Sequence, residues 1–235
     1  MDLRRGLVAL GDSITRGQGG APALGVHPQS WVQWLAEALE LPLTNLAVDG
    51  ACAPDVLREQ VPRLQGPYDL ATLHVGANDA RSTGFDAATF ERAVDEVLAA
   101  LGDAAGRTLV VTVPLDLGRP RAGADVAAAD VILRRLAEAH GALVCGLEDL
   151  RGPRVLLPDA VHPTSAGMVA IAERAADALA AAGVVVPRRP ATLPHADERT
   201  DAVARVRYGA WWLRQLARDH ARRLAERRQY RRDPT

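Results

Sequence analysis

Short apolar segments alternate with longer amphipathic segments along residues 6–182. The apolar segments are rich in Val and Leu and predict β-strands at residues 7–10, 43–47, 70–75, 108–113 and 142–147. Apolar positions that recur every three or four residues predict helices at residues 30–41, 53–64, 87–101, 125–139 and 166–182. Strands that are apolar on both faces and alternate with helices are typical of a covered parallel sheet. We therefore expect a three-layer α/β/α domain over residues 1–182.

The pattern changes beyond this domain. Residues 183–198 contain three prolines and predict a linker that runs over the surface. Residues 199–235 predict a basic amphipathic C-terminal helix, regular to about residue 230. Its apolar positions recur at spacings of three, four and seven and form one stripe, made of Val203, Val206, Ala210, Leu213, Ala217 and Leu224.

Charge is distributed unevenly although the formal net charge is only -1. Residues 188–235 hold 13 arginines against six acidic residues, a net of +7, so the preceding residues carry -8. The predicted helix could dock on this acidic body, pair with a second subunit as a homo-oligomer, or lie on an anionic membrane surface with Trp211 and Trp212. We favour docking or self-association, because the stripe needs to be buried. No sequence signature of a nucleic-acid-binding fold accompanies the charge, so no nucleic acid is expected.

Other features of the sequence narrow the cellular context. The two cysteines, Cys52 and Cys145, are too few for a disulfide framework. No apolar run approaches the roughly 20 residues of a membrane-spanning helix. The chain enters its first predicted strand within a few residues, without the apolar region of a signal peptide. A cytoplasmic location is therefore expected.

Nucleophilic chemistry is indicated at two distant points of the chain. A Gly-Asp-Ser sequence that ends at Ser13 directly follows the first predicted strand, where a hydroxyl can face a cleft. Asp159 and His162 precede the last predicted helix, for which Thr164 is the expected N-cap. Their spacing of three residues lets the carboxylate hold one imidazole nitrogen while the other takes a proton from Ser13. These are the components of a Ser-His-Asp triad.

An oxyanion site is also indicated. Asn78 follows the third predicted strand and can direct its side-chain amide at a developing negative charge. Gly50 follows the second strand, and its N–H and that of Ser13 can supply further donors. For each of Gly50 and Asn78 taken alone, a turn glycine or a helix cap is the better explanation.

Four blocks, GDSIT, NLAVDGA, GAND and DAVHP, occur in this order over residues 6–182. Together they resemble the SGNH hydrolases, the GDSL esterase and lipase family; only Thr15, often serine in that family, departs from the pattern. The resemblance implies a flavodoxin-like sheet of five parallel strands in the order 2-1-3-4-5, and no metal or organic cofactor. It implies these roles: nucleophile Ser13, base His162, its partner Asp159, and oxyanion donors Ser13, Gly50 and Asn78.

The expected function is therefore hydrolysis of a small-molecule carboxylic ester through an acyl-enzyme intermediate. The alternative is a non-catalytic or acyl-transferring domain of this type, whose basic C-terminal helix mediates protein or membrane binding. Loops at residues 17–28 and 114–124 are expected at the rim of the site. His74 is expected to be a packed core residue, and Asp12 and Asp79 to brace turns by hydrogen bonding.

Overall fold

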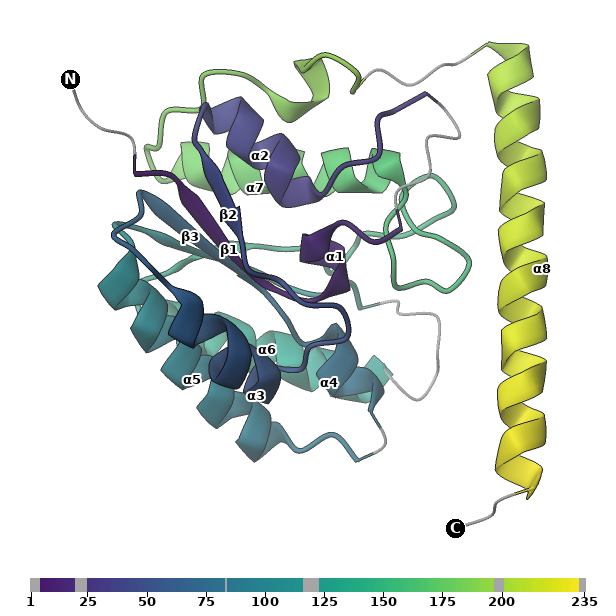
Figure 1. The fold of residues 1–235 in the computed structure, drawn as a ribbon, viewed down its shortest axis with the longest axis horizontal. Coiled ribbons are helices and arrows are strands. Elements are labelled where there is room, and N and C mark those ends of the chain that lie inside the picture. Colours follow the sequence, from purple (N-terminus) through teal and green to yellow (C-terminus); the bar gives the residue numbers. More distant parts are fainter. Residues whose placement is uncertain (1–4, 20–24, 83, 116–122, 197–200, 233–235) are drawn as a thin grey trace.

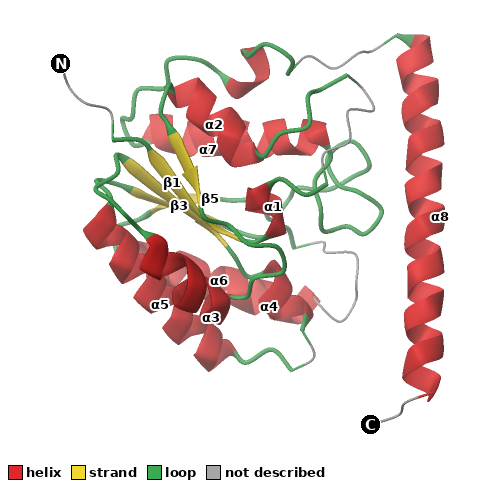
Figure 2. Ribbon diagram, viewed as in Figure 1, coloured by secondary structure: helices red, strands yellow, loops and turns green. Residues whose placement is uncertain are grey.

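The computed structural model describes residues 5–19, 25–82, 84–115, 123–196 and 201–232. Five parallel strands form one sheet in the order β2-β1-β3-β4-β5 (Figures 1 and 2). The strands are β1 (Leu7–Gly11), β2 (Leu43–Asn45), β3 (Leu70–His74), β4 (Thr108–Val111) and β5 (Leu143–Cys145). The fold class and the strand order expected from the sequence are both confirmed.

The position of β1 in the sheet determines where a ligand can bind. Leu7 pairs with Leu43 of β2 on one side and with Leu70 of β3 on the other. The chain leaves β1 toward one edge of the sheet and later returns to build β3, β4 and β5 toward the other edge. The connections that follow β1 and β3 therefore diverge, and in such folds ligands usually bind between these connections, at the carboxyl ends of the strands.

Helices cover both faces of the sheet. One face carries α2 (Trp31–Leu39) and α7 (Ser165–Ala181); the other carries α3 (Ala53–Asp55), α5 (Ala87–Ala104) and α6 (Gly123–Ala139) (Figure 1). Alternate residues of a strand point to opposite faces. Leu7 and Ala9 accordingly pack in the core beneath α2 and α7, and Val8 and Leu10 pack in the core beneath α5 and α6.

The predicted helix at residues 53–64 is a run of three different helical geometries. After α3 come a π-helical turn, η1 (Val56–Gln60), and a 3-10 turn, η2 (Val61–Arg63). Pro62 has no N–H to donate, so a regular α-helix cannot continue through it. Two further helices, α1 (Ser13–Arg16) and α4 (Ala77–Arg81), are too short to show a periodicity and were not expected.

Residues 183–196 lie against the body. Leu193 and Ala196 are buried in the core beneath α2 and α7. A 3-10 turn, η3 (Pro190–Thr192), directly precedes Leu193 in the chain. The Arg189 guanidinium forms ion pairs with Glu173 and with Asp177 of α7. This segment therefore adds packing to the domain, and the division of the chain into three parts stays a prediction.

Helix α8 (Ala202–Arg232) has 31 residues, which at 1.5 Å per residue is about 46 Å. It lies on the same side of the sheet as α1 (Figure 1). The prediction that its apolar stripe docks on the body is wrong, because Val206 and Leu213 are 72% and 65% exposed. The buried apolar residue in the described part of α8 is Ala204, which does not belong to the predicted stripe. Within the described part of the chain, no helix combines the length and apolarity that a membrane span requires.

Candidate active site

Ser13 is presented by a tight turn at the end of β1. Asp12 caps α1 by accepting a hydrogen bond from the Ile14 N–H at 3.0 Å, and Ser13 is the first residue of that helix. Gly11, before them, has φ +152°, and a Cβ at this position would lie 2.4 Å from the His74 carbonyl oxygen. Only glycine lets the chain turn so close to β3. This turn brings the Ser13 hydroxyl to the carboxyl edge of the sheet.

His162 and Asp159 lie in the loop between β5 and α7. The Asp159 Oδ1 accepts hydrogen bonds from the N–H groups of Val161 and His162, at 2.9 and 3.0 Å. Its Oδ2 lies 2.8 Å from the Nδ1 of His162. Thr164 caps α7 by accepting from the Gly167 N–H, as predicted. The carboxylate therefore fixes both the backbone turn and the orientation of the imidazole ring.

The two parts of the predicted triad meet across 149 residues of sequence. The Ser13 Oγ lies 3.0 Å from the Nε2 of His162. A close approach of the loop at Gly19 accompanies this contact, since a Cβ there would lie 2.9 Å from the Cβ of His162. The structure thus brings Ser13, His162 and Asp159 into one chain of hydrogen bonds.

Asp159 is held in its charged form. Burial alone would raise the pKa of Asp159, but the hydrogen bonds from the His162 ring and from the Val161 and His162 N–H groups lower it below its ordinary value. A charged carboxylate at the Nδ1 of His162 favours the tautomer with its proton on Nδ1. The Nε2 atom is then free to accept a proton from Ser13.

The predicted oxyanion donors lie on three segments that follow β1, β2 and β3: Ser13 begins α1, Gly50 lies in the loop after β2, and Asn78 lies in α4. Asn78, in α4, donates from Nδ2 to the Ala51 carbonyl at 3.1 Å and to the Asp12 Oδ2 at 3.4 Å. Its amide group therefore touches both the residue before Ser13 and the residue after Gly50. Gly50 is exposed, has φ +76°, and has no atom within 4 Å of the position that a Cβ would occupy.

Gln60 supports the turn that carries Ser13, a role that was not predicted from the sequence. This fully buried side chain donates to the Gly11 carbonyl at 2.8 Å and accepts from the Gly11 N–H at 2.9 Å. It thereby satisfies both backbone groups at the end of β1. A lone glutamine within a helix carries no sequence signal, so only the fold could reveal it. A second link, an exposed ion pair of 3.2 Å, joins Arg16 to Asp49, beside Gly50.

Two acidic residues and a histidine are buried beneath the site, as predicted. Asp12 braces its own turn, and Asp79 accepts from the Ala53 N–H at 2.9 Å. Burial raises the pKa of Asp12 to about 7 and that of Asp79 to about 6. His74 is fully buried in β3, and burial lowers its pKa to about 4, so the ring is neutral near pH 7. Among the described residues, the Ser13 hydroxyl forms its hydrogen bond with His162 and with none of these three side chains.

Cysteine and metal chemistry find no support among the described residues. Cys52 and Cys145 are both free, as expected, and burial raises the pKa of their thiols to about 11 and about 12. Neither is therefore a reactive thiolate near neutral pH. No group of three or more His, Cys, Asp or Glu side chains within the described ranges could hold a metal ion.

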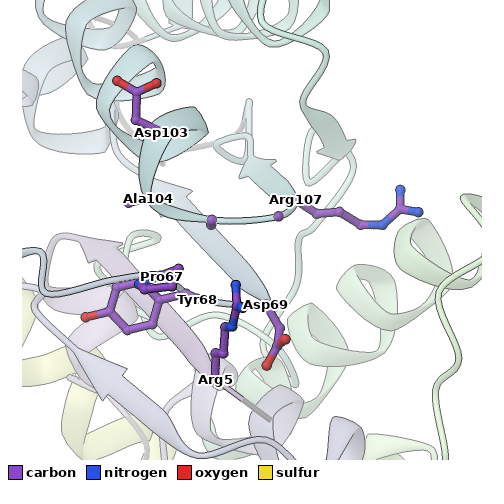
Figure 3. Close-up of a pocket in the computed structure, with 9 residues that line it drawn as sticks. Arg5, Pro67, Tyr68, Asp69, Asp103, Ala104 and Arg107 are labelled. Atoms are coloured by element: carbon purple, nitrogen blue, oxygen red, sulfur yellow. The ribbon is translucent and has the colours of Figure 1, made fainter. Parts of the chain in front are cut away.

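A cavity of about 410 Å³ lies at the opposite edge of the sheet. It is lined by residues that precede β1, β3 and β4, among them Arg5, Asp69, Asp103 and Arg107. Figure 3 shows Asp103 and Arg107 pointing away from Arg5 and Asp69. Because its charged groups do not converge, this cavity is not the candidate site. The predicted rim loops at the other edge include residues 20–24 and 116–122, which lie outside the described residues.

Comparisons with known proteins concern the family and the fold. The profile of the GDSL-like lipase/acylhydrolase family matches residues 9–170, a span that holds every predicted site residue. The chain therefore belongs to the GDSL-like lipase/acylhydrolase family and is an ester hydrolase of that family. None of the curated proteins matches the sequence significantly.

Solved structures of similar fold include three hydrolases. An α/β hydrolase, LAE5, from the metagenome of Lake Arreo, Spain, is 23% identical with a TM-score of 0.58, over 76% of this chain and 95% of that one. The acetylxylan esterase Axe2 of Geobacillus stearothermophilus is 16% identical with a TM-score of 0.60, over 78% and 96%. An extracellular lipase of Streptomyces rimosus is 22% identical with a TM-score of 0.55, over 73% and 98%. At these identities the likeness concerns the fold.

Proposed function

We propose that this protein is a serine esterase that hydrolyses a carboxylic ester through an acyl-enzyme intermediate, with Ser13, His162 and Asp159 as its triad. The observation that carries the proposal is the unbroken hydrogen-bond chain from the Ser13 hydroxyl through the His162 ring to the Asp159 carboxylate. A serine hydroxyl is a weak nucleophile until a base takes its proton during attack. The family assignment supports ester hydrolysis as the reaction class.

Each triad residue has one role in the first half of the reaction. The Oγ of Ser13 forms a bond to the ester carbonyl carbon while its proton passes to the Nε2 of His162. The carboxylate of Asp159 stabilises the resulting imidazolium through Nδ1. When the tetrahedral intermediate collapses, the C–O bond to the alcohol breaks and His162 returns the proton to the leaving oxygen. Ser13 then carries the acyl group.

Water completes the cycle by the same path. His162 takes a proton from the water molecule as its oxygen attacks the acyl carbonyl. The bond to the Ser13 Oγ breaks, Ser13 recovers its proton from His162, and the carboxylic acid departs.

The oxyanion of both tetrahedral intermediates accepts hydrogen bonds from the Asn78 side chain and from the N–H groups of Gly50 and Ser13. Preorganised donors of this kind are often the largest electrostatic contribution to acyl transfer. The Asn78 amide is already held between Ala51 and Asp12. Its 3.4 Å bond to Asp12 is long for a hydrogen bond, so that hydrogen is the one that the oxyanion captures.

Small esters with short acyl groups are the first substrates to test. Gly50 is exposed and leaves open space beside the proposed oxyanion site, and a structural relative is an acetylxylan esterase. A panel of p-nitrophenyl esters of increasing acyl length, with acetylated xylo-oligosaccharides beside it, identifies the acyl and alcohol parts.

The test of the proposal is hydrolysis of p-nitrophenyl acetate by the Ser13→Ala variant. We expect kcat/KM to fall by about 10³-fold or more, because the variant has no nucleophile for the first step. Ser165→Ala is the matched control, since Ser165 is also buried but its hydroxyl has no hydrogen-bond partner among the residues that the structure describes. Circular dichroism verifies that both variants fold. Turnover at the wild-type rate in folded Ser13→Ala would overturn the assignment.

A further inference from the structure

Helix α8 turns its aromatic side toward the body. Ala204 is buried and Tyr208 is half-buried, and the Tyr208 hydroxyl donates a hydrogen bond to the Pro153 carbonyl. The Tyr208 ring lies 5.5 Å from the ring of Trp211 and 6.5 Å from that of Trp212, measured between centroids. Pro153 belongs to the loop between β5 and α7 that also carries Asp159, so α8 contacts the same loop as the candidate active site.

The opposite side of α8 is aliphatic and exposed. Successive helical residues are about 100° apart around the axis, which places Val206 and Leu213 nearly opposite Ala204 and Tyr208, with Val203 about 60° from Val206. Eight large apolar side chains are exposed among the described residues, and five of them form this surface: Val203, Val206, Leu213, Leu216 and Leu224. An apolar stripe of this length on one exposed helix is stable in water only when something covers it.

Positive charge borders this stripe. The segment Ala202–Arg232 contains ten arginines against Asp219 and Glu226, a net charge of +8. Arg205 lies on one side of the stripe and Arg207 and Arg214 on the other, all with exposed side chains. A stripe of Val and Leu between rows of arginine is complementary to the surface of an anionic lipid bilayer, where the acyl chains can bury the apolar side chains and the headgroup phosphates can pair with the arginines.

Pairing with the α8 of a second copy fits less well. The heptad positions that a coiled coil would bury include Ala210, Ala217 and His220, which are too small or too polar for a stable seam. The flanking positions at Arg207 and Arg214 carry the same charge, so two copies would repel each other there. A nucleic acid would meet the charge but would leave the aliphatic stripe uncovered.

We propose that α8 is a membrane-docking helix that lies in the surface of an anionic lipid bilayer, with its Val and Leu stripe inserted and its arginines on the lipid phosphates. This role goes beyond the proposed esterase function. Through Tyr208 and Pro153, docking holds the candidate active site close to the bilayer.

The test is co-sedimentation of the full chain with vesicles of phosphatidylcholine alone and of an equimolar mixture of phosphatidylcholine and phosphatidylglycerol. We expect binding to the mixed vesicles only, weakening as salt is raised because ions screen the arginines. The Val206→Gln/Leu213→Gln variant should bind roughly 30-fold more weakly, since two inserted side chains become polar. Removing two charges in Arg207→Gln/Arg214→Gln should weaken binding by roughly 30-fold as well.

Matched controls lie on the body. Val131→Gln alters another exposed valine, on α6, and Arg63→Gln/Arg107→Gln removes two exposed arginines; both should bind like the wild type. Hydrolysis of a soluble ester without vesicles should be unchanged in all four variants, which separates this proposal from the esterase assignment. Equal binding to both vesicle types, or no binding, would overturn the proposal. A dimer on size exclusion that becomes monomeric in Val206→Gln/Leu213→Gln would also overturn the proposal. Tight RNA binding that persists in Val206→Gln/Leu213→Gln would overturn it as well.

Discussion

At the carboxyl ends of β1 and β3, side chains from separate loops are joined by hydrogen bonds, whereas at the amino ends of the same strands the charged side chains stand apart. Ser13, His162 and Asp159 form one chain of contacts at the first edge. Around the cavity at the second edge, the side chains of Asp103 and Arg107 point away from those of Arg5 and Asp69 (Figure 3). The difference teaches that a hollow with polar walls does not make a site; convergence of complementary groups does.

The largest expected difference is between two variants that each exchange a carboxylate for an amide, one at each edge of the sheet. Asp159→Asn should lower kcat for p-nitrophenyl acetate by about 10⁴-fold, because an amide at Nδ1 no longer enforces the productive tautomer or stabilises the imidazolium. Asp103→Asn, at the other edge, should leave kcat unchanged. Equal effects of the two variants in steady-state kinetics would erase the distinction between the edges.

A smaller effect is expected for the amide side chains. Asn78→Ala should lower kcat by about 10²–10³-fold with little change in KM, because the lost hydrogen bond forms mainly in the transition state. Gln65→Ala, exposed near the amino edge, is the comparison variant and should behave like the wild type. If Asn78→Ala raised KM alone, the side chain would bind substrate and would not stabilise an oxyanion.

Gln60 tests whether support beneath the catalytic edge matters. Gln60→Leu leaves the buried N–H of Gly11 without its partner and the Gly11 carbonyl with only the Val48 N–H, which loosens the turn that positions Ser13. We expect kcat to fall about 10-fold while KM stays near its wild-type value. Thr72→Val is the matched core change and should keep full activity, because within the described part of the chain the buried Thr72 hydroxyl has no hydrogen-bond partner. A kcat that tracks thermal stability equally in both variants would reduce Gln60 to a purely structural residue.

The last comparison concerns stability and its dependence on pH. Asp12 has an ordinary pKa of 3.8 in the unfolded chain and about 7 in the folded protein, so the folded state holds the extra proton between these values. Its contribution to the unfolding free energy is therefore lost as pH rises from about 4 to about 7. His74, with its pKa lowered, acts in the opposite sense over an overlapping range.

The Asp12→Asn variant isolates this contribution. Urea unfolding of the wild type and the variant between pH 5 and pH 8 should show the variant gaining on the wild type as pH rises, by on the order of 2–4 kcal/mol. A constant offset from the altered side chain does not affect this trend. Parallel curves would mean that Asp12 is ionised throughout the range.

The strands and the three residues Ser13, His162 and Asp159 that hydrogen bonds link could be predicted from the sequence because each has a local signal. Apolar runs located all five strands, but each predicted strand from 43–47 onward ended too late, since Val75 and Leu147 remain buried after the ladder stops. The convergence of Ser13 with His162 depended on the order of the strands, which came from the family resemblance. The glycines at turns could be identified in the sequence, but the close contacts of Gly11 with His74 and of Gly19 with His162 could not.

Other features had no local signal at all. Gln60 acts through its place beneath Gly11, which only the packed fold defines. The side of α8 that faces the body also escaped prediction, because periodicity locates an apolar stripe but does not say what covers it. Here the aromatic side met the body through Tyr208, and the aliphatic side was left exposed.

The most direct test of the central claim is the site of covalent labelling by a fluorophosphonate ester probe. Trypsin cleaves after Arg5 and Arg16, and the peptide of residues 6–16 contains Ser13 as its one serine. Mass spectrometry should find the adduct on this peptide in the wild type and lose it in His162→Ala, where no base activates the hydroxyl. An adduct on a different serine, or no adduct on active protein, would contradict the account.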